Sequence, residues 1–256
     1  KFQDPIITAK GEERAVVALT HLRTLWFNTG SLCNITCTNC YMESSPKNDS
    51  LAYLTLQDVT RYLDEIETEG YEVEEIAFTG GEPFMNPDLI PMLDEVLTRG
   101  FNALVLTNAM KPMAHKHDKL LHLQQKFGNQ LSLRVSMDHY SQDRHELERG
   151  KKSWQPMLDG LRWLSNNGFN LAVAGRTCWD EDPDTALQGY TGLFKSEAIA
   201  INVETPGKLV LFPEMDAKLD VPEITVSCWE ILGVAPETMM CASSRMIVKR
   251  RGADTP

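Results

Sequence analysis

The sequence reads CNITCTNCY over residues 33–41, so that Cys33, Cys37 and Cys40 place half of the six cysteines of the chain on one short stretch. Three thiols on one loop are typical of a metal site. Structural zinc takes four ligands, usually as two separated pairs, whereas an iron-sulfur cluster binds cysteine thiolates and can leave one iron for a non-protein ligand. The CxxxCxxC spacing favours the cluster.

Two other interpretations of three close cysteines are an incomplete zinc knuckle and a redox-active thiol cluster. A zinc knuckle needs a fourth ligand nearby. The nearest histidine upstream is His21, and none follows until His115. This distance disfavours zinc.

The composition of the 256 residues, with 42% apolar and 24% charged residues, is that of an ordinary globular protein. No apolar run approaches the roughly 18 to 20 residues that span a bilayer, and residues 1–10 lack the apolar centre of a secretory signal. Clustered cysteines suit a reducing compartment. We therefore expect a cytoplasmic protein with no membrane partner.

The balance of 25 basic and 36 acidic residues gives a net charge of -11. This charge argues against sequence-independent binding to nucleic acid, which depends on neutralising phosphates. The basic residues 249–251 are too few to change this expectation. We find no internal repeat that would indicate a solenoid.

Strand-like apolar runs alternate with segments of helical periodicity along most of the chain. The predicted strands are residues 22–29, 76–79, 103–107, 131–137, 171–177 and 198–203. The predicted helices are residues 55–70, 86–100, about 118–127 and 153–168, with Thr55, Asn86 and Ser153 as N-terminal caps. This alternation predicts an α/β fold with a parallel sheet and right-handed crossovers. A curled barrel and an open doubly wound sheet remain alternatives on periodicity alone.

A second motif, TGGEP at residues 79–83, ends the second predicted strand. Two glycines at a strand end allow the backbone to approach a ligand closely, and the Glu82 carboxylate beside them can hold an ammonium group. Taken alone the motif is weak, since most Gly-Gly pairs are only turns. Its position one strand after the cysteine loop makes it informative, because ligand sites collect at the carboxyl ends of parallel strands.

With both motifs in this order, the chain resembles the radical S-adenosylmethionine (SAM) superfamily. The resemblance implies a partial (β/α)6 TIM-like barrel in which Cys33, Cys37 and Cys40 hold three irons of a [4Fe-4S] cluster. The fourth iron then binds the amino and carboxylate groups of SAM. Both the cluster and SAM are expected cofactors.

The same resemblance implies that Gly80, Gly81 and Glu82 bind the methionine amino group of SAM. At the end of the fourth predicted strand, Ser136 and Asp138 resemble the SxD signature of a branch with peptide-modifying members. Ser136 is expected to hydrogen-bond the SAM ribose or carboxylate, and Asp138 to do the same or to face the substrate. Both can equally be ordinary strand-end caps.

Three further residues are candidates for the SAM pocket. Asn108 follows the third predicted strand, where the family often has Thr-Asn. An arginine fork suits the SAM carboxylate, and Arg176 at the end of the fifth strand is our first choice, with Arg149 on the loop after the fourth strand as the second. Either arginine can instead belong to an ordinary ion pair. No catalytic residue is assigned.

The function implied by the resemblance is an oxidoreductase-type radical SAM enzyme. SAM is cleaved reductively to methionine and a 5'-deoxyadenosyl radical, which abstracts hydrogen from a peptide or small-molecule substrate. Such chemistry requires a low-potential electron donor of the flavodoxin or ferredoxin type as a partner. The alternative is a non-catalytic iron-sulfur or zinc protein that carries electrons or scaffolds a partner.

We expect three regions: a lead-in at residues 1–21, the partial barrel at 22–206 and a C-terminal extension at 207–256. The extension resembles the start of the auxiliary-cluster module called SPASM or twitch. Its cysteines, Cys228 and Cys241, cannot complete a four-cysteine site, so small buried hydrophobes are the expected role.

Near the end of the extension, residues 245–250 are predicted to form a strand. Gly252 is predicted to turn a hairpin after it. We expect an exposed or disordered end after about Arg251.

Overall fold

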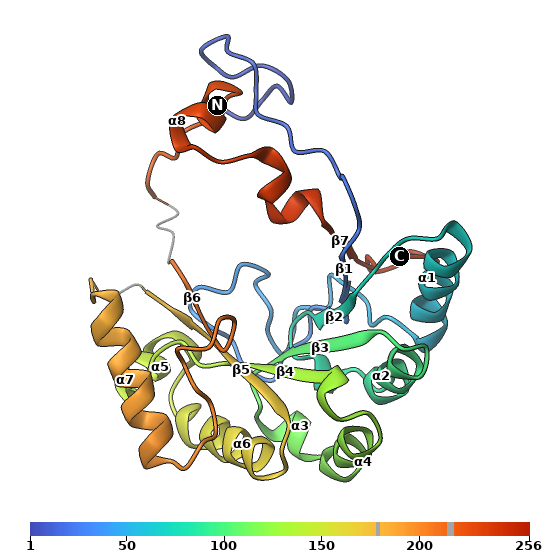
Figure 1. The fold of residues 1–256 in the computed structure, drawn as a ribbon, viewed down its shortest axis with the longest axis vertical. Helices are drawn as coiled ribbons and strands as arrows, with labels where there is room; N and C mark the ends of the chain where they lie inside the picture. Colours follow the sequence, from blue (N-terminus) through green and yellow to red (C-terminus); the bar gives the residue numbers. More distant parts are fainter. Residues whose placement is uncertain (178–179, 214–217) are drawn as a thin grey trace.

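A computed structural model describes residues 1–177, 180–213 and 218–256. Its centre is one sheet of seven parallel strands in the order β6-β5-β4-β3-β2-β1-β7, which curls into a half-barrel (Figure 1). The strands are β1 (Thr24–Asn28), β2 (Glu75–Thr79), β3 (Asn102–Thr107), β4 (Leu131–Ser136), β5 (Asn170–Arg176), β6 (Leu209–Phe212) and β7 (Ser244–Ile247). The predicted α/β fold with a partial TIM-like barrel is confirmed.

Helices follow the strands and cover the outer, convex side of the sheet (Figure 1). The α-helices are α1 (Leu56–Glu69), α2 (Leu89–Thr98), α3 (Lys111–Ala114), α4 (His117–Phe127), α5 (Gln142–Arg149), α6 (Trp154–Asn166), α7 (Pro183–Ser196) and α8 (Ser227–Leu232). Short 3-10 turns are η1 (Pro83–Met85), η2 (Gly128–Gln130), η3 (Pro236–Thr238) and η4 (Met240–Ala242). The buried core lies between helices and strands and includes Phe27, Leu63, Phe78, Leu93 and Leu133.

Helix α1 begins as its sequence predicts. The Thr55 hydroxyl accepts a hydrogen bond from the Asp58 amide, and the Asp58 carboxylate accepts one from the Thr55 amide at 2.9 Å, so the capping box is complete. Gly70 ends the helix in the left-handed conformation with φ 69°. Lys249 adds an ion pair to Asp58 at 3.0 Å, which ties α1 to the segment after β7.

The sixth predicted strand is wrong. Residues 198–203 form the exit from α7, and β6 is the later run Leu209–Phe212, which pairs with β5. Ala198 takes a φ of 53°, and the Ile199 amide donates to the Phe194 carbonyl at 2.8 Å. Ile199 and Val203 are buried. The apolar spacing that indicated a strand therefore serves core packing in an irregular segment.

Two predicted helix starts also differ in detail. Helix α2 begins at Leu89, three residues after Asn86. The Asn86 side-chain oxygen accepts a hydrogen bond from the Asp88 amide at 2.8 Å, and its NH₂ group donates to the carbonyls of Thr29 and Leu54 at 3.1 and 2.9 Å. Ser153 does stand at the N-cap position of α6, but its hydroxyl makes no capping bond. Helices α3, α5 and α7 were not predicted.

The strand predicted at residues 245–250 joins the main sheet. It is β7 at Ser244–Ile247, and it pairs in parallel with β1, with Trp26 opposite Met246. The Ala253 amide donates to the Arg250 carbonyl at 3.0 Å and Gly252 takes a φ of 79°, so the predicted turn forms after β7, while the observed partner of β7 is the first strand of the barrel. Residues 251–255 are exposed, as predicted.

The first 20 residues and the segment around α8 run side by side, away from the helices of the barrel (Figure 1). The Arg14 guanidinium forms an ion pair with the Glu223 carboxylate, and the Ala15 amide donates to the Ile224 carbonyl at 3.0 Å. In this region Cys228 is half-buried and Cys241 is exposed. The prediction that both are buried is wrong for Cys241.

Within the described ranges, no helix has the length and apolar character to cross a bilayer.

Candidate active site

The cysteine loop leaves the carboxyl end of β1 and is tied back to the chain at its start. The Cys33 amide donates to the Ser45 carbonyl at 3.1 Å, and Leu32 and Ser45 form an isolated bridge. Cys33 is buried, with 5% of its surface exposed, whereas Cys37 and Cys40 are half-buried. All three thiols are free.

Each of the three sulfurs faces an N–H donor. The Asn108 amide group lies 3.9 Å from the Cys33 sulfur, the Arg149 guanidinium 3.9 Å from that of Cys37, and a loop backbone amide 3.3 Å from that of Cys40. Such donors favour the thiolate form over the thiol. This environment suits cysteines that act as metal ligands.

Burial opposes that ionisation while no cation is bound. It raises the pKa of Cys33 to about 11, and it also raises the pKa of Cys37, against the lowering effect of the Arg149 guanidinium. A metal bound at the sulfurs reverses this balance, because a coordinated thiol is deprotonated. The donor set therefore fits the iron of a cluster.

Within residues 1–177, 180–213 and 218–256, no three His, Cys, Asp or Glu side chains converge on a position where one metal ion could bind. In a cluster, the thiolates bind different irons and need not meet at one point. The spread of the three sulfurs is compatible with a cluster.

Gly80 and Gly81 bring the end of β2 into contact with the cysteine loop. A Cβ on Gly81 would lie 2.1 Å from the Leu32 carbonyl oxygen, and a Cβ on Gly80 would lie 2.6 Å from that of Gly30. The Gly81 amide donates to the Gly30 carbonyl at 2.8 Å. Close backbone approach was predicted toward a ligand. The observed approach is to the chain that carries the cysteines, which joins the two motifs into one unit.

Glu82 points inward, with 2% of its surface exposed. Its carboxylate accepts hydrogen bonds from the Thr107 hydroxyl and the Asn108 amide, both at 2.8 Å, and from the Phe84 amide at 3.2 Å. Desolvation outweighs these donors and raises the pKa of Glu82 to about 7. A carboxylate offers about four acceptor positions, so one position remains for a ligand.

The remaining candidates at the ends of β3 and β4 differ in their surroundings. Asn108 is buried, and its amide group donates to Asn34 at 2.9 Å as well as facing Cys33. Ser136 is the last residue of β4 and half-buried. Asn108 is therefore part of the cysteine environment, whereas the structure gives Ser136 a position at the strand end and no further role.

Asp138 joins the two arginine candidates. It is 3% exposed and accepts two hydrogen bonds from Arg149, at 2.7 and 3.1 Å, and one from Arg176 at 3.3 Å. Arg176 also donates to the Asn39 carbonyl at 3.0 Å. Arg149 lies at the end of helix α5, which corrects its predicted place on a loop. Both arginines thus have a carboxylate partner already.

The end of α5 also holds the cysteine loop, which the sequence did not indicate. The Thr38 amide donates to the Glu148 carbonyl at 2.8 Å, and its hydroxyl to the Leu147 carbonyl at 3.0 Å. The Asn39 side chain donates to the Glu148 carboxylate at 3.0 Å. No motif marks these positions, and a helix prediction for residues 142–149 was the one signal that could have suggested them.

We compared the sequence with models of protein families and with known proteins. The model of the Radical SAM superfamily matches residues 27–184, more than half of the chain. The subtilosin biosynthesis protein AlbA of Bacillus subtilis is 29% identical over 143 residues, which cover 56% of this chain and 30% of AlbA. The GTP 3',8-cyclase of Tolumonas auensis is 26% identical over 188 residues, which cover 73% of this chain and 53% of the cyclase. The chain thus spans about half or less of these relatives.

Solved structures share the fold. SuiB of Streptococcus suis bound to S-adenosylmethionine matches with a TM-score of 0.61 at 12% identity, over 93% of this chain and 63% of SuiB. SuiB bound to its precursor peptide SuiA matches with a TM-score of 0.60 at 13% identity, over 77% of this chain and 40% of SuiB.

Proposed function

Because the chain belongs to the radical SAM superfamily, we propose that it cleaves S-adenosylmethionine reductively and modifies a peptide or small-molecule substrate. The family implies a [4Fe-4S] cluster and SAM as cofactors. When bound, they supply a 5'-deoxyadenosyl radical that takes a hydrogen atom from the substrate. The protein's part is to hold, orient and shield these groups.

In this proposal Cys33, Cys37 and Cys40 hold three irons of the cluster. Their N–H donors stabilise the charge on the sulfurs. The guanidinium of Arg149 carries a full positive charge beside the Cys37 sulfur. Burial acts to lower the pKa of Arg149, but the neighbouring Asp138 carboxylate and thiol sulfurs raise it on balance. This charge keeps the cluster environment from becoming too negative for reduction.

Glu82 receives the ammonium group of SAM at its free acceptor position. The amides of Gly81 and Glu82 already donate to the cysteine loop, at 2.8 and 3.0 Å, so their carbonyl oxygens are the groups that suit a cationic ligand. Arg176 and Asp138 form the opposite wall, where the guanidinium can share its donors between Asp138 and the SAM carboxylate. Ser136 and Asn108 complete the pocket.

The observation that most supports the proposal is the backbone contact between the two motifs. A side chain larger than glycine at position 81 would collide with the Leu32 carbonyl, directly before Cys33. The chain has therefore placed a carboxylate-bearing turn directly against a three-thiol loop. A scaffold protein without SAM has no need for this juxtaposition.

The test is anaerobic reconstitution with iron and sulfide, reduction with dithionite, and measurement of 5'-deoxyadenosine formed from SAM. We expect close to four irons per chain and release of 5'-deoxyadenosine. Cys37→Ala should lose iron and activity, whereas Cys241→Ala, which changes an exposed thiol far along the chain, should lose neither. One zinc with no sulfide, or no 5'-deoxyadenosine from the reduced protein, would contradict the proposal.

A peptide is the substrate class that we propose first. AlbA is a bacteriocin biosynthesis protein, and the matching SuiB structure contains a precursor peptide.

We further propose a flavodoxin or ferredoxin as electron donor and a cytoplasmic location, since thiolate ligands need reducing conditions. We also propose the region from 207 onward as an extension of the SPASM or twitch kind, although β6 and β7 within it pair with the barrel sheet.

A further inference from the structure

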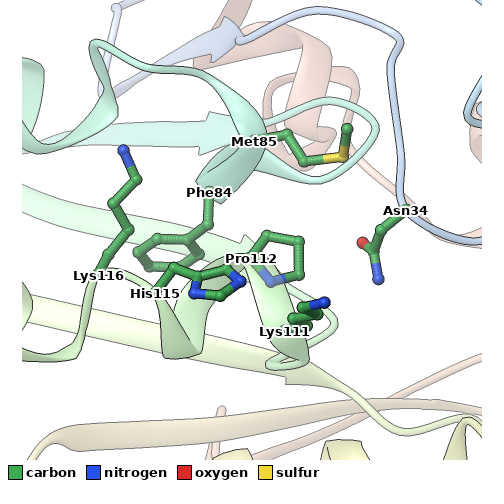
Figure 2. A pocket seen from close by; sticks show the side chains of 7 residues that line it. All are labelled: Asn34, Phe84, Met85, Lys111, Pro112, His115 and Lys116. Atoms are coloured by element: carbon green, nitrogen blue, oxygen red, sulfur yellow. The ribbon is translucent and has the colours of Figure 1, made fainter.

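A pocket of about 440 Å³ lies beside the cysteine loop, between η1 and helix α3. Phe84, Met85 and Pro112 supply apolar surface, and Asn34 lines one side (Figure 2). Its size falls within the range of about 300 to 1,000 Å³ that is usual for ligand sites, and an apolar lining with a few polar groups is also usual.

The polar groups of this pocket are cationic or neutral. Lys111, His115 and Lys116 line it, and no lining residue is acidic. Figure 2 shows Lys111 and Lys116 on opposite sides of the Phe84 and Pro112 rings. Two lysine charges therefore flank an apolar floor that no carboxylate lines. They select an anion that also carries an apolar group.

These two lysines have no carboxylate partner in the described part of the chain. Lys1, Lys126 and Lys249, for example, each form an ion pair with a carboxylate. Lys111 and Lys116 form no such pair in this part of the chain. Their charges are therefore not needed to neutralise a neighbour and remain available for a ligand.

The pocket is connected to the cluster loop through Asn34, which directly follows Cys33. The Asn34 side-chain oxygen accepts a hydrogen bond from Asn108 at 2.9 Å, and its amide group faces the Met110 sulfur at 3.9 Å. The Asn108 backbone in turn donates to Glu82. A ligand in the pocket thus contacts a residue that belongs to the environment of the first cluster cysteine.

We infer that this pocket binds an acidic residue of the peptide substrate, with the carboxylate at Lys111 or Lys116 and a neighbouring apolar side chain over Met85 and Pro112. The inference rests on the proposed function and names a sequence feature of the substrate. A concave site of this size receives a side chain, whereas docking of a whole protein buries about 800 Å² on each partner. A peptide therefore fits better than an acidic redox protein.

The experiment measures fluorescence anisotropy of a fluorescein-labelled peptide of alternating glutamate and leucine, titrated with the cluster-loaded protein under anaerobic conditions. A peptide with glutamine in place of glutamate is the charge control. We expect saturable binding that weakens with salt and is roughly tenfold tighter for the glutamate peptide. No saturable binding, or equal binding of both peptides, overturns the inference.

The site is identified with matched variants. Lys111→Gln with Lys116→Gln should weaken binding roughly tenfold, while arginine at both positions should restore it. Lys10→Gln with Lys195→Gln removes the same charge from exposed positions elsewhere and should change binding less than about twofold. If the variant with Lys111→Gln and Lys116→Gln binds the peptide as tightly as the native protein, the assignment of the binding site is overturned.

A second measurement places the ligand without any substitution. A diazirine-bearing version of the glutamate peptide should crosslink to Met85 or Pro112, as mapped by mass spectrometry. Crosslinks confined to other segments overturn the inference. Equal affinity for N-acetylglutamate alone would overturn the peptide assignment. Binding of a flavodoxin that depends on the two lysines, with no binding of the peptide, would overturn the inference and assign this face to electron delivery.

These readouts are separate from the proposed reaction. Peptide binding that depends on the two lysines, in a protein that forms no 5'-deoxyadenosine, would refute the proposed function and leave the binding site. Formation of 5'-deoxyadenosine, together with peptide binding that does not depend on the two lysines, would support the proposed function and refute the binding site.

Discussion

Replacing Glu82 by glutamine is expected to remove a loss of stability that the native protein suffers as pH rises. Burial raises the pKa of Glu82 from 4.5 to about 7, although three hydrogen-bond donors act against the shift. The folded protein therefore binds this proton more tightly than the unfolded chain. The stabilisation is complete below about pH 4.5 and is lost as pH rises through about 7.

The size of the effect follows from the two pKa values. Their difference corresponds to about 3 kcal/mol of unfolding free energy, as an upper estimate. Glutamine has nearly the same shape but does not titrate. Its NH₂ group faces the Asn108 amide in place of an oxygen, and one unsatisfied buried donor costs about 1–3 kcal/mol at every pH. Relative to the native protein, the variant should therefore gain stability between pH 5 and pH 8.

The assay is urea denaturation followed by circular dichroism at several pH values, on the protein before cluster loading. Glu72→Gln, at an exposed position, is the control and should leave the pH dependence unchanged. A stability difference between native and Glu82→Gln protein that stays constant from pH 5 to pH 8 would refute the reasoning. So would a native protein that gains stability over this range relative to the variant.

Three further predictions concern other parts of the fold. Asp138→Asn should cost about 3 kcal/mol in urea denaturation, because it removes the buried carboxylate that two half-buried arginines share, whereas Asp143→Asn at an exposed position should cost little. Gly81→Ala should abolish cluster loading, measured as iron per chain, because its Cβ collides with a backbone oxygen; Gly192→Ala, on an open helix surface, should leave loading intact and raise the melting temperature slightly. Thr55→Ala should lower the unfolding free energy by about 1 kcal/mol, and an unchanged urea midpoint would contradict the capping box.

Local rules predicted the parts of the fold that depend on local interactions. The capping box of α1 needs only Thr55 and Asp58, and the strands β1 to β5 are apolar runs between clear turn signals. Residues 198–203 show the limit of such rules. The spacing of apolar residues indicates which side chains are buried, but it does not indicate which conformation the backbone takes there. Helix α7 was missed although Asp182 caps it and Pro183 occupies its first position, a signal that the sequence did contain.

The sequence indicated candidate residues for the site and not the partners that these side chains have in the structure. The motifs indicated Glu82 and the cysteines, but the pairing of Arg149 and Arg176 through Asp138 depends on how a helix and two strands meet. Distances between residues on different elements are not contained in spacing along the chain. For the same reason, the contact of α5 with the cysteine loop could be seen only in three dimensions.

The position of β7 has a consequence for synthesis of the chain. β1 ends at Asn28, yet its neighbour on one side, β7, begins only at Ser244 and so leaves the ribosome much later. At roughly 5–20 residues per second, the interval is on the order of ten seconds or more. During this time one edge of β1 exposes unpaired backbone groups, which are a template for association with other chains. The nascent protein should therefore depend on chaperones until β7 is in place.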